Sequence, residues 1–259
     1  MRSKSMHINL RNNISFLQFS IDLFKKCASV ESHKQSSLKS EKNKMSKSTK
    51  ATKKTVTNDS RESSNTSAIA EFKNALSSAV QTRLQNDTAI SDKSVEALRD
   101  YEKTMSHDVI VTVLLECKYN AANAIVRERA NAYRNIYTLT RKDTNLARAL
   151  ASAMSLNHFT KALFLSAHAL SKADKALSFQ DAAKCCDASF VAKNDHDQLL
   201  VVTSNQATHN TISSQLSSSI QSLLNFNLIK ESRNSNNQTV FEFVKSKLAD
   251  KLVAHSIAI

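Results

Sequence analysis

Apolar side chains recur every three or four residues along most of the chain after residue 67, and this spacing predicts α-helices. The pattern continues through three stretches, 68–100, 107–139 and 144–192. The middle stretch is predicted to be the longest single helix, because the period runs through it from Ile110 to Leu139. Frequent alanines in the third stretch predict closely packed helices. The expected fold class is therefore mainly α, built as a helical bundle.

In the last quarter of the chain, the spacing of apolar residues changes twice, from helical to alternating and back to helical. Leu216, Ile220 and Leu223 lie on one face of a predicted helix, and serine and glutamine fill the other face. Alternating residues then predict two short strands around a polar loop, followed by a last helix that begins near Ser246. The strands are expected at 228–232 and 239–244, with the loop at 233–238. The order predicts a small module of helices and a β-hairpin.

The chain contains no Gly, no Pro and no Trp, although average usage predicts roughly 18 Gly and roughly 13 Pro. Three origins are compatible with this: selection for an almost entirely helical protein, an artificial chain with a restricted alphabet, or a gene that avoids GG and CC dinucleotides. In each case, left-handed backbone positions must be filled by Asn or Asp, the next most tolerant residues. The C-caps of helices are among these positions.

Residues 211–252 resemble the C-terminal part of the winged-helix transcription regulators, especially the MarR-like family. In that family a recognition helix ends in a Gly-Leu-Ile or Gly-Leu-Val step, followed by a strand, a charged wing, a second strand and a helix. Asn227-Leu228-Ile229 stands at that step in this chain, with Asn in place of the usual Gly. The resemblance therefore implies a left-handed cap at Asn227, since Asn is the best substitute for Gly at such a position. The resemblance covers about 40 residues and implies a C-terminal module that binds DNA.

The resemblance implies DNA contacts from the recognition helix and from the wing. Gln can pair with adenine, and Ser can bind phosphate. The chain departs from the family because the helix before the recognition helix is weak and the recognition helix has no Lys or Arg. An alternative interpretation is that the helix and hairpin only complete a core or an oligomer interface. The candidate DNA-contacting residues are Ser214, Gln215, Ser217, Ser218 and Gln221 on the helix, with Arg233 and Asn236 on the wing.

Residues 1–66 form a basic arm, with 14 Lys or Arg against 5 Asp or Glu, which gives +9 of the total net charge of +13. Its low complexity after residue 33 predicts a largely disordered segment. A basic arm of this kind attracts polyanions such as DNA, although a purely solubilising tail is the alternative. The lysines expected to contact DNA phosphates are Lys47, Lys50, Lys53 and Lys54.

The start of the arm has a different character. Apolar residues at helical spacing predict a short amphipathic helix at 12–27. Residues 1–30 are also basic and poor in acids, which is typical of a mitochondrial presequence. A membrane-surface helix and a helix that docks on the folded domain are the other interpretations.

No motif for catalysis, cofactor binding or metal binding occurs in the sequence. There is no P-loop, no HExxH pair and no nucleophile elbow. Cys27, Cys117, Cys185 and Cys186 lack a CxxC spacing, so reduced thiols of an intracellular protein are expected. No run of about 18 apolar residues is present, which argues against integral membrane contact. The expected protein is therefore not an enzyme.

The sequence thus predicts three segments: the arm at 1–66, a helical domain at 67–193 and a winged-helix-like module at 194–259. The first hypothesis is a DNA-binding transcription regulator, or a replication or partition accessory protein, in the cytoplasm, nucleoid or nucleus. A homodimer is a further expected assembly. The second hypothesis is a non-catalytic helical interaction protein, and the third is an artificial chain without an evolved function.

Overall fold

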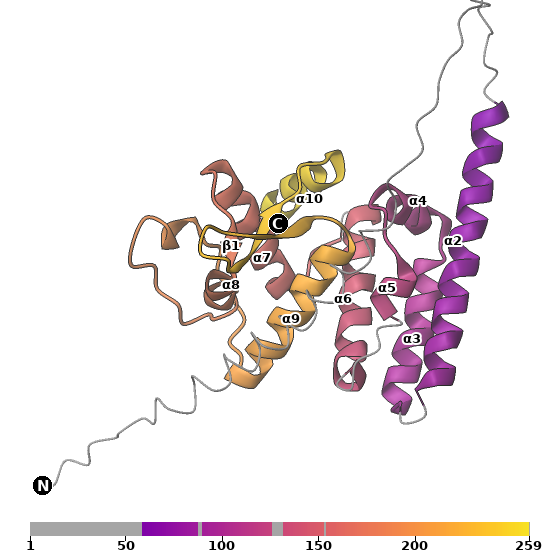
Figure 1. The fold of residues 1–259 in the computed structure, drawn as a ribbon, viewed down its shortest axis with the longest axis horizontal. Coiled ribbons are helices and arrows are strands. Elements are labelled where there is room, and N and C mark those ends of the chain that lie inside the picture. The colour runs from indigo at the N-terminus through magenta and orange to yellow at the C-terminus, as the bar shows by residue number, and fades with distance from the viewer. Residues whose placement is uncertain (1–58, 88–89, 126–131, 153, 259) are drawn as a thin grey trace, which may run out of the picture. The chain divides into compact units, whose positions relative to one another are not determined.

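The computed structural model describes residues 59–87, 90–125, 132–152 and 154–258 (Figure 1). Val56–Ile259 form one compact unit. This unit is mainly helical and contains a small three-stranded antiparallel sheet. The helix predicted at 12–27, the rest of the arm up to residue 58, and its four candidate lysines lie outside the described residues.

The first part of the unit consists of helices packed side by side. Leu76 of the first helix and Leu98 and Tyr101 of the second are fully buried. Apolar residues at helical spacing therefore face a shared core, and the first two helices lie next to each other (Figure 1). The elements are α2 (Asp59–Asn86), α3 (Asp92–Met105), α4 (Asp108–Glu116), α5 (Ala121–Ile125) and α6 (Ala132–Ser152).

The single helix predicted over 107–139 is wrong. α4 ends at Glu116, and Lys118 adopts a left-handed conformation with φ of 54°. The spacing of apolar residues does not show where this helix ends, because Cys117 and Tyr119 on either side of the turn are also buried in the core. The chain starts a new helix, α5, after the turn.

The second part of the unit brings helices and the sheet together. The helical stretch predicted to run to residue 192 ends earlier than expected, since α8 ends at Cys185. A loop containing one turn of 3-10 helix then leads to α9. The elements are α7 (His158–Lys172), β1 (Leu177–Ser178), α8 (Phe179–Cys185), η1 (Asp197–Leu199), α9 (His209–Asn225), β2 (Ile229–Arg233), β3 (Thr239–Phe243) and α10 (Lys247–Ala258).

The predicted β-hairpin is confirmed. β2 and β3 pair antiparallel, with Ile229 opposite Phe243 and Arg233 opposite Thr239. The sequence did not predict β1, which pairs with the other side of β3 through Leu177 opposite Phe241. The strand order is therefore β1-β3-β2, and β3 is the central strand.

The segment boundaries of the structure differ from those expected. α2 begins at Asp59, so residue 66 falls inside a helix. The sheet joins β1, which precedes residue 193, to the hairpin that follows it. α9 also packs against α6 as well as against α7 and α8. The expected helical domain and C-terminal module consequently share one core.

None of the helices in the described ranges combines the length and the apolar character that crossing a membrane needs.

Candidate nucleic-acid interface

α9 is held at both ends by local hydrogen bonds. At its start, the Thr208 hydroxyl accepts a hydrogen bond from the backbone N–H of Thr211 at 3.4 Å. At its end, Asn227 adopts φ of 50°, which confirms the predicted left-handed cap. The Asn227 side chain also donates from Nδ2 to the carbonyl of Cys117 at 2.6 Å. The cap therefore fixes the end of α9 against the turn after α4.

One face of α9 is part of the core. Leu216, Ile220 and Leu223 are buried as the helical period predicts. Ser219 is also fully buried, and its hydroxyl accepts a hydrogen bond from Thr160 of α7 at 3.2 Å. These contacts set the rotation of α9 about its own axis, and so decide which residues face outward.

A buried polar network joins α9 to α6 at the C-terminal half of α9. Asp143 of α6 is fully buried, and its Oδ2 accepts hydrogen bonds from the Tyr119 hydroxyl and from Asn225 Nδ2, the latter at 3.1 Å. The Tyr101 hydroxyl lies 2.7 Å from that of Tyr119. Because Tyr119 donates to the carboxylate, Tyr101 donates to Tyr119. Four separate segments of the chain therefore meet at one carboxylate.

Burial raises the pKa of Asp143 to about 6, against the opposing effect of the nearby Ser222 hydroxyl and of the hydrogen bonds from Tyr119 and Asn225. The Ser222 hydroxyl faces the carboxylate but does not reach ordinary hydrogen-bond geometry, and Asp143 Oδ1 has no partner among the described residues. Burial also raises the pKa of Tyr101 and of Tyr119, so both phenols stay neutral.

The network was not predicted from the sequence, but a signal for it exists. Asp143 lies seven residues after Ile136, three before Leu146 and seven before Leu150, all of which are buried. A carboxylate at that spacing falls on the apolar face of the helix. Its position alone therefore indicates a buried and hydrogen-bonded acid.

The candidate residues on α9 differ in how exposed they are. Ser214 is exposed, while Gln215, Ser217 and Gln221 are half-buried. Ser218 is buried, and its hydroxyl donates to the carbonyls of Ser214 and Gln215 at 2.9 and 3.2 Å. Ser218 is consequently not accessible for the DNA contact that the sequence predicts.

The open part of α9 is its N-terminal half. Asn210 and Thr211 are exposed there, and neither was among the predicted residues. Asn210, Ser214 and Ser217 follow the spacing i, i+4 and i+7, which places them on one stripe of the helix surface. We call these three residues the open stripe.

The wing is a short, well-braced turn. Asn234 Oδ1 accepts hydrogen bonds from the backbone N–H groups of Asn236 and Gln238 at 3.0 and 2.9 Å. Arg233 is exposed, and its Nη1 donates to the carbonyl of Asn237 at 3.0 Å. Asn236 is exposed at the tip. The two predicted wing residues thus lie on a rigid, accessible loop.

The positive charge near this surface is small. Residues 158–258 contain 10 Lys or Arg and 8 Asp or Glu, a difference of +2. Lys230 on β2 is neutralised by Glu242 on β3, whose Oε2 lies 2.8 Å from the ammonium nitrogen. Electrostatic attraction to a polyanion must therefore come mainly from elsewhere in the chain.

A charged cluster fixes the loop that leads to α9. Lys184 Nζ lies 2.7 Å from Asp197 Oδ1, and His196 Nε2 lies 3.1 Å from Asp181 Oδ2. Asp181 also forms a capping box with Ser178 at the start of α8. Within the described ranges, no group of three His, Cys, Asp or Glu side chains is placed to hold a metal ion. The two ion pairs tie α8 to the loop around Asp197.

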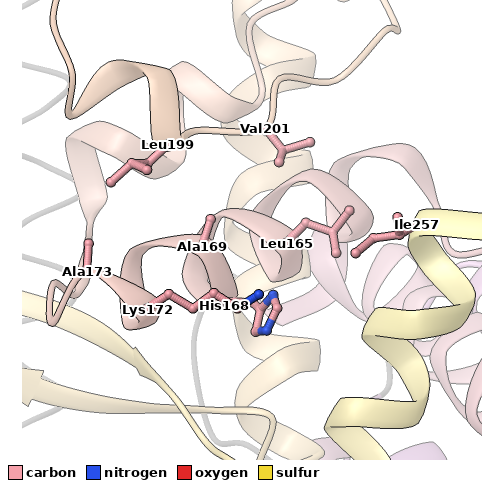
Figure 2. Close-up of a pocket in the computed structure, with 8 residues that line it drawn as sticks. All are labelled: Leu165, His168, Ala169, Lys172, Ala173, Leu199, Val201 and Ile257. Atoms are coloured by element: carbon pink, nitrogen blue, oxygen red, sulfur yellow. The ribbon is translucent and has the colours of Figure 1, made fainter.

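An apolar hollow of about 470 Å³ lies between α7, the segment after η1 and α10 (Figure 2). Leu165, Val201 and Ile257 line it, with His168 and Lys172 as its polar members. Burial and the nearby Lys172 lower the pKa of His168. The lining contains no carboxylate or thiol that could form a catalytic pair with His168.

The described cysteines do not provide reactive thiols. Cys117, Cys185 and Cys186 are free and buried. Burial raises the pKa of each of them to about 12. A nucleophilic cysteine requires the thiolate form, so these three serve as small apolar core residues.

Comparison with known proteins finds no matching family model, no matching curated protein and no matching solved structure.

Proposed function

We propose that residues 158–258 form a winged-helix module and that the protein binds DNA through α9 and the wing. The observation that carries this proposal is the order of the elements, in which α8 and α9 are followed directly by the β2–β3 hairpin. The sequence suggested a weak helix near residues 199–202 before the recognition helix. α8, positioned by its capping box, supplies that preceding helix instead.

The accessible residues fit this mode of binding. In helix-turn-helix proteins the N-terminal residues of the recognition helix contact base edges in the major groove. Asn210, Thr211 and Ser214 are exposed in that half of α9, whereas the C-terminal half is occupied by contacts with α6 and α7. Arg233 and Asn236 extend the polar surface onto the wing.

The basic arm is proposed to supply the general attraction to the phosphate backbone. Residues 1–55 hold 13 Lys or Arg and 3 Asp or Glu, a difference of +10. Contacts between lysine and phosphate release counterions and give affinity without sequence preference. In this division of roles, α9 and the wing position the protein and the arm strengthens binding.

Fluorescence anisotropy with a labelled duplex of about 25 base pairs tests the proposal. The full-length chain should bind at low salt, and its affinity should fall steeply and log-linearly as the salt concentration rises. Substitution of Ser214 and Gln215 by Glu should weaken binding at every salt concentration, while the same change at Asn205 and Gln206 serves as control. Absence of binding at 50 mM salt would overturn the proposal.

A second function is favoured by one specific observation. Asn225 of α9 donates to Asp143, and Ser219 accepts from Thr160, so α9 is used as a structural element between α6 and α7. This supports the alternative in which α9 and the hairpin complete the core of a non-catalytic helical protein, whose proposed role is then assembly with another chain rather than DNA binding. Light scattering of the full-length chain, with and without duplex DNA, distinguishes the two: assembly without DNA favours the second function.

A further inference from the structure

We infer that the DNA read by α9 is rich in A·T base pairs, an inference that rests on the proposed function. On the accessible half of α9, the polar side chains that the structure describes carry only amide and hydroxyl groups. Among them, Asn210, Thr211 and Ser214 are exposed, and Gln215 and Ser217 are half-buried.

The major-groove edges of the two base pairs demand different side chains. Guanine presents two acceptors, which Arg or Lys satisfies, and cytosine presents an amino donor, which Asp or Glu accepts. Residues 209–225 contain no Lys, Arg, Asp or Glu. α9 therefore lacks both kinds of side chain that read a G·C pair strongly.

Adenine presents a donor and an acceptor side by side, and a carboxamide matches both at once. Asn210 and Gln215 each carry a carboxamide on the accessible half of α9. Thymine adds a methyl group that the methyl of Thr211 can contact. The exposed chemistry of the helix is thus complementary to A·T pairs.

Arg233 does not change this preference. Its Nη1 is engaged by the carbonyl of Asn237 at 3.0 Å, so the guanidinium lacks part of the fork that a bidentate contact with guanine requires. It also lies on the wing, outside the helix. The remaining serines of the stripe bind either kind of base and do not discriminate.

The test uses the full-length chain and two duplexes of equal length, one with only A·T pairs in its central 12 positions and one with only G·C pairs. Equal length keeps the phosphate contacts of the arm the same for both. Each bidentate contact to the correct base gives at least about a fivefold preference. The A·T duplex should therefore bind at least about fivefold more tightly.

A double substitution assigns the preference to the helix. Asn210→Ala with Gln215→Ala should bring the two affinities to within about twofold of each other. Asn205→Ala with Gln206→Ala is the matched control, because these exposed amides lie in the loop before α9, and it should keep the preference. Thermal melting followed by circular dichroism verifies that both variants are folded.

Three results would contradict the inference, and they are distinguishable. Equal binding of the two duplexes, or tighter binding of the G·C duplex, overturns A·T readout and leaves the proposed DNA binding in place. An A·T preference that survives the Asn210 and Gln215 substitutions overturns its assignment to α9. Binding to neither duplex at low salt overturns the proposed function together with the inference.

Discussion

Three helices of the described chain end at a left-handed residue that is not glycine. Lys118 after α4, Asp174 after α7 and Asn227 after α9 have φ of 54°, 51° and 50°. In each case the next backbone N–H bonds to a carbonyl five residues earlier, for example Leu228 to Leu223 at 3.0 Å. This is the Schellman arrangement, in which glycine is the usual residue. A side chain at such a position costs about 1–2 kcal/mol.

Replacing these residues by glycine should have opposite effects at two of the sites. Lys118→Gly should raise the free energy of unfolding by about 0.5–1 kcal/mol, because the steric cost of a Cβ outweighs the added freedom of the unfolded chain. Asn227→Gly should lower it by about 1 kcal/mol, because the hydrogen bond to the Cys117 carbonyl is lost. Urea unfolding measures both. Lys118→Ala is the control and should change little, since it retains a Cβ.

Asp143 makes the stability depend on pH. Its pKa is about 6 in the folded chain, and a free Asp has a pKa of about 3.9. The folded state therefore holds its proton more tightly than the unfolded state. The stability that comes from this difference in pKa is fully present below pH 4 and is lost as the pH rises through 6. Tyr119 and Tyr101, the titratable groups that form this network with Asp143, stay neutral throughout.

Asp143→Asn should raise the free energy of unfolding at pH 7.5 by on the order of 1–2 kcal/mol, because it removes a buried charge and keeps an oxygen that accepts from Tyr119 and Asn225. Between pH 5 and 7.5 the substituted protein should lose less stability than the original. Urea unfolding at both pH values measures this. An unchanged pH dependence would show that Asp143 is not the group responsible.

At the scale of elements, the packing of α9 explains why this helix is rich in serine. The sequence places its serines on a solvent-facing side, but Ser218, Ser219 and Ser222 are buried. α9 packs against both α6 and α7, so small polar side chains suit the places where the helices come close together. The Ser218 hydroxyl donates to backbone carbonyls, the Ser219 hydroxyl accepts from Thr160, and the Ser222 hydroxyl faces Asp143.

Enlarging a buried serine should therefore be costly, and enlarging an exposed one should not. Ser219→Leu should lower the free energy of unfolding by about 2 kcal/mol or more, from overpacking and from the lost partner of Thr160. Ser214→Leu, one turn earlier on the exposed side, should change it by less than about 0.5 kcal/mol. Denaturant unfolding of both variants provides the measurement. Equal effects would mean that α9 is not packed as described.

At the scale of the whole molecule, charge and folded structure are separated along the chain. Residues 1–55 hold +10 of the total net charge of +13, whereas the proposed reading helix has no charged residue among Lys, Arg, Asp and Glu. Affinity and sequence preference should accordingly respond to different substitutions. A deletion of residues 1–66 is a poor test, because it would remove the start of α2.

Neutralising the arm in the full-length chain is the sharper experiment. Changing Lys47, Lys50, Lys53 and Lys54 to Gln should reduce the slope of log affinity against log salt by about 0.9 for each phosphate contact that is lost. The A·T preference should remain, because α9 is unchanged. The same four changes to Arg keep the charge and should keep the slope. A slope that does not change with Gln would exclude these lysines from DNA contact.

The sequence by itself determined the elements that depend on local hydrogen bonding. The period of apolar residues predicted the mainly helical character, although not the break after α4, and the alternation in 228–244 predicted the hairpin, which the structure confirms. The Gly of the winged-helix step, replaced here by Asn, predicted the left-handed Asn227. The helices and the cap are set by residues within a few positions of each other, and the two strands of the hairpin are neighbours along the chain.

Only the tertiary structure decided which elements meet. β1 has two residues and no period of its own, and it exists because Leu177 pairs with Phe241, far along the chain. The turn at Lys118, the burial of Ser219 and the network at Asp143 likewise depend on partners from distant segments. Helices and hairpins form through hydrogen bonds between residues that are near one another in the sequence, so local patterns predict them. Burial depends on packing between segments that are far apart in the sequence, so local patterns do not predict it.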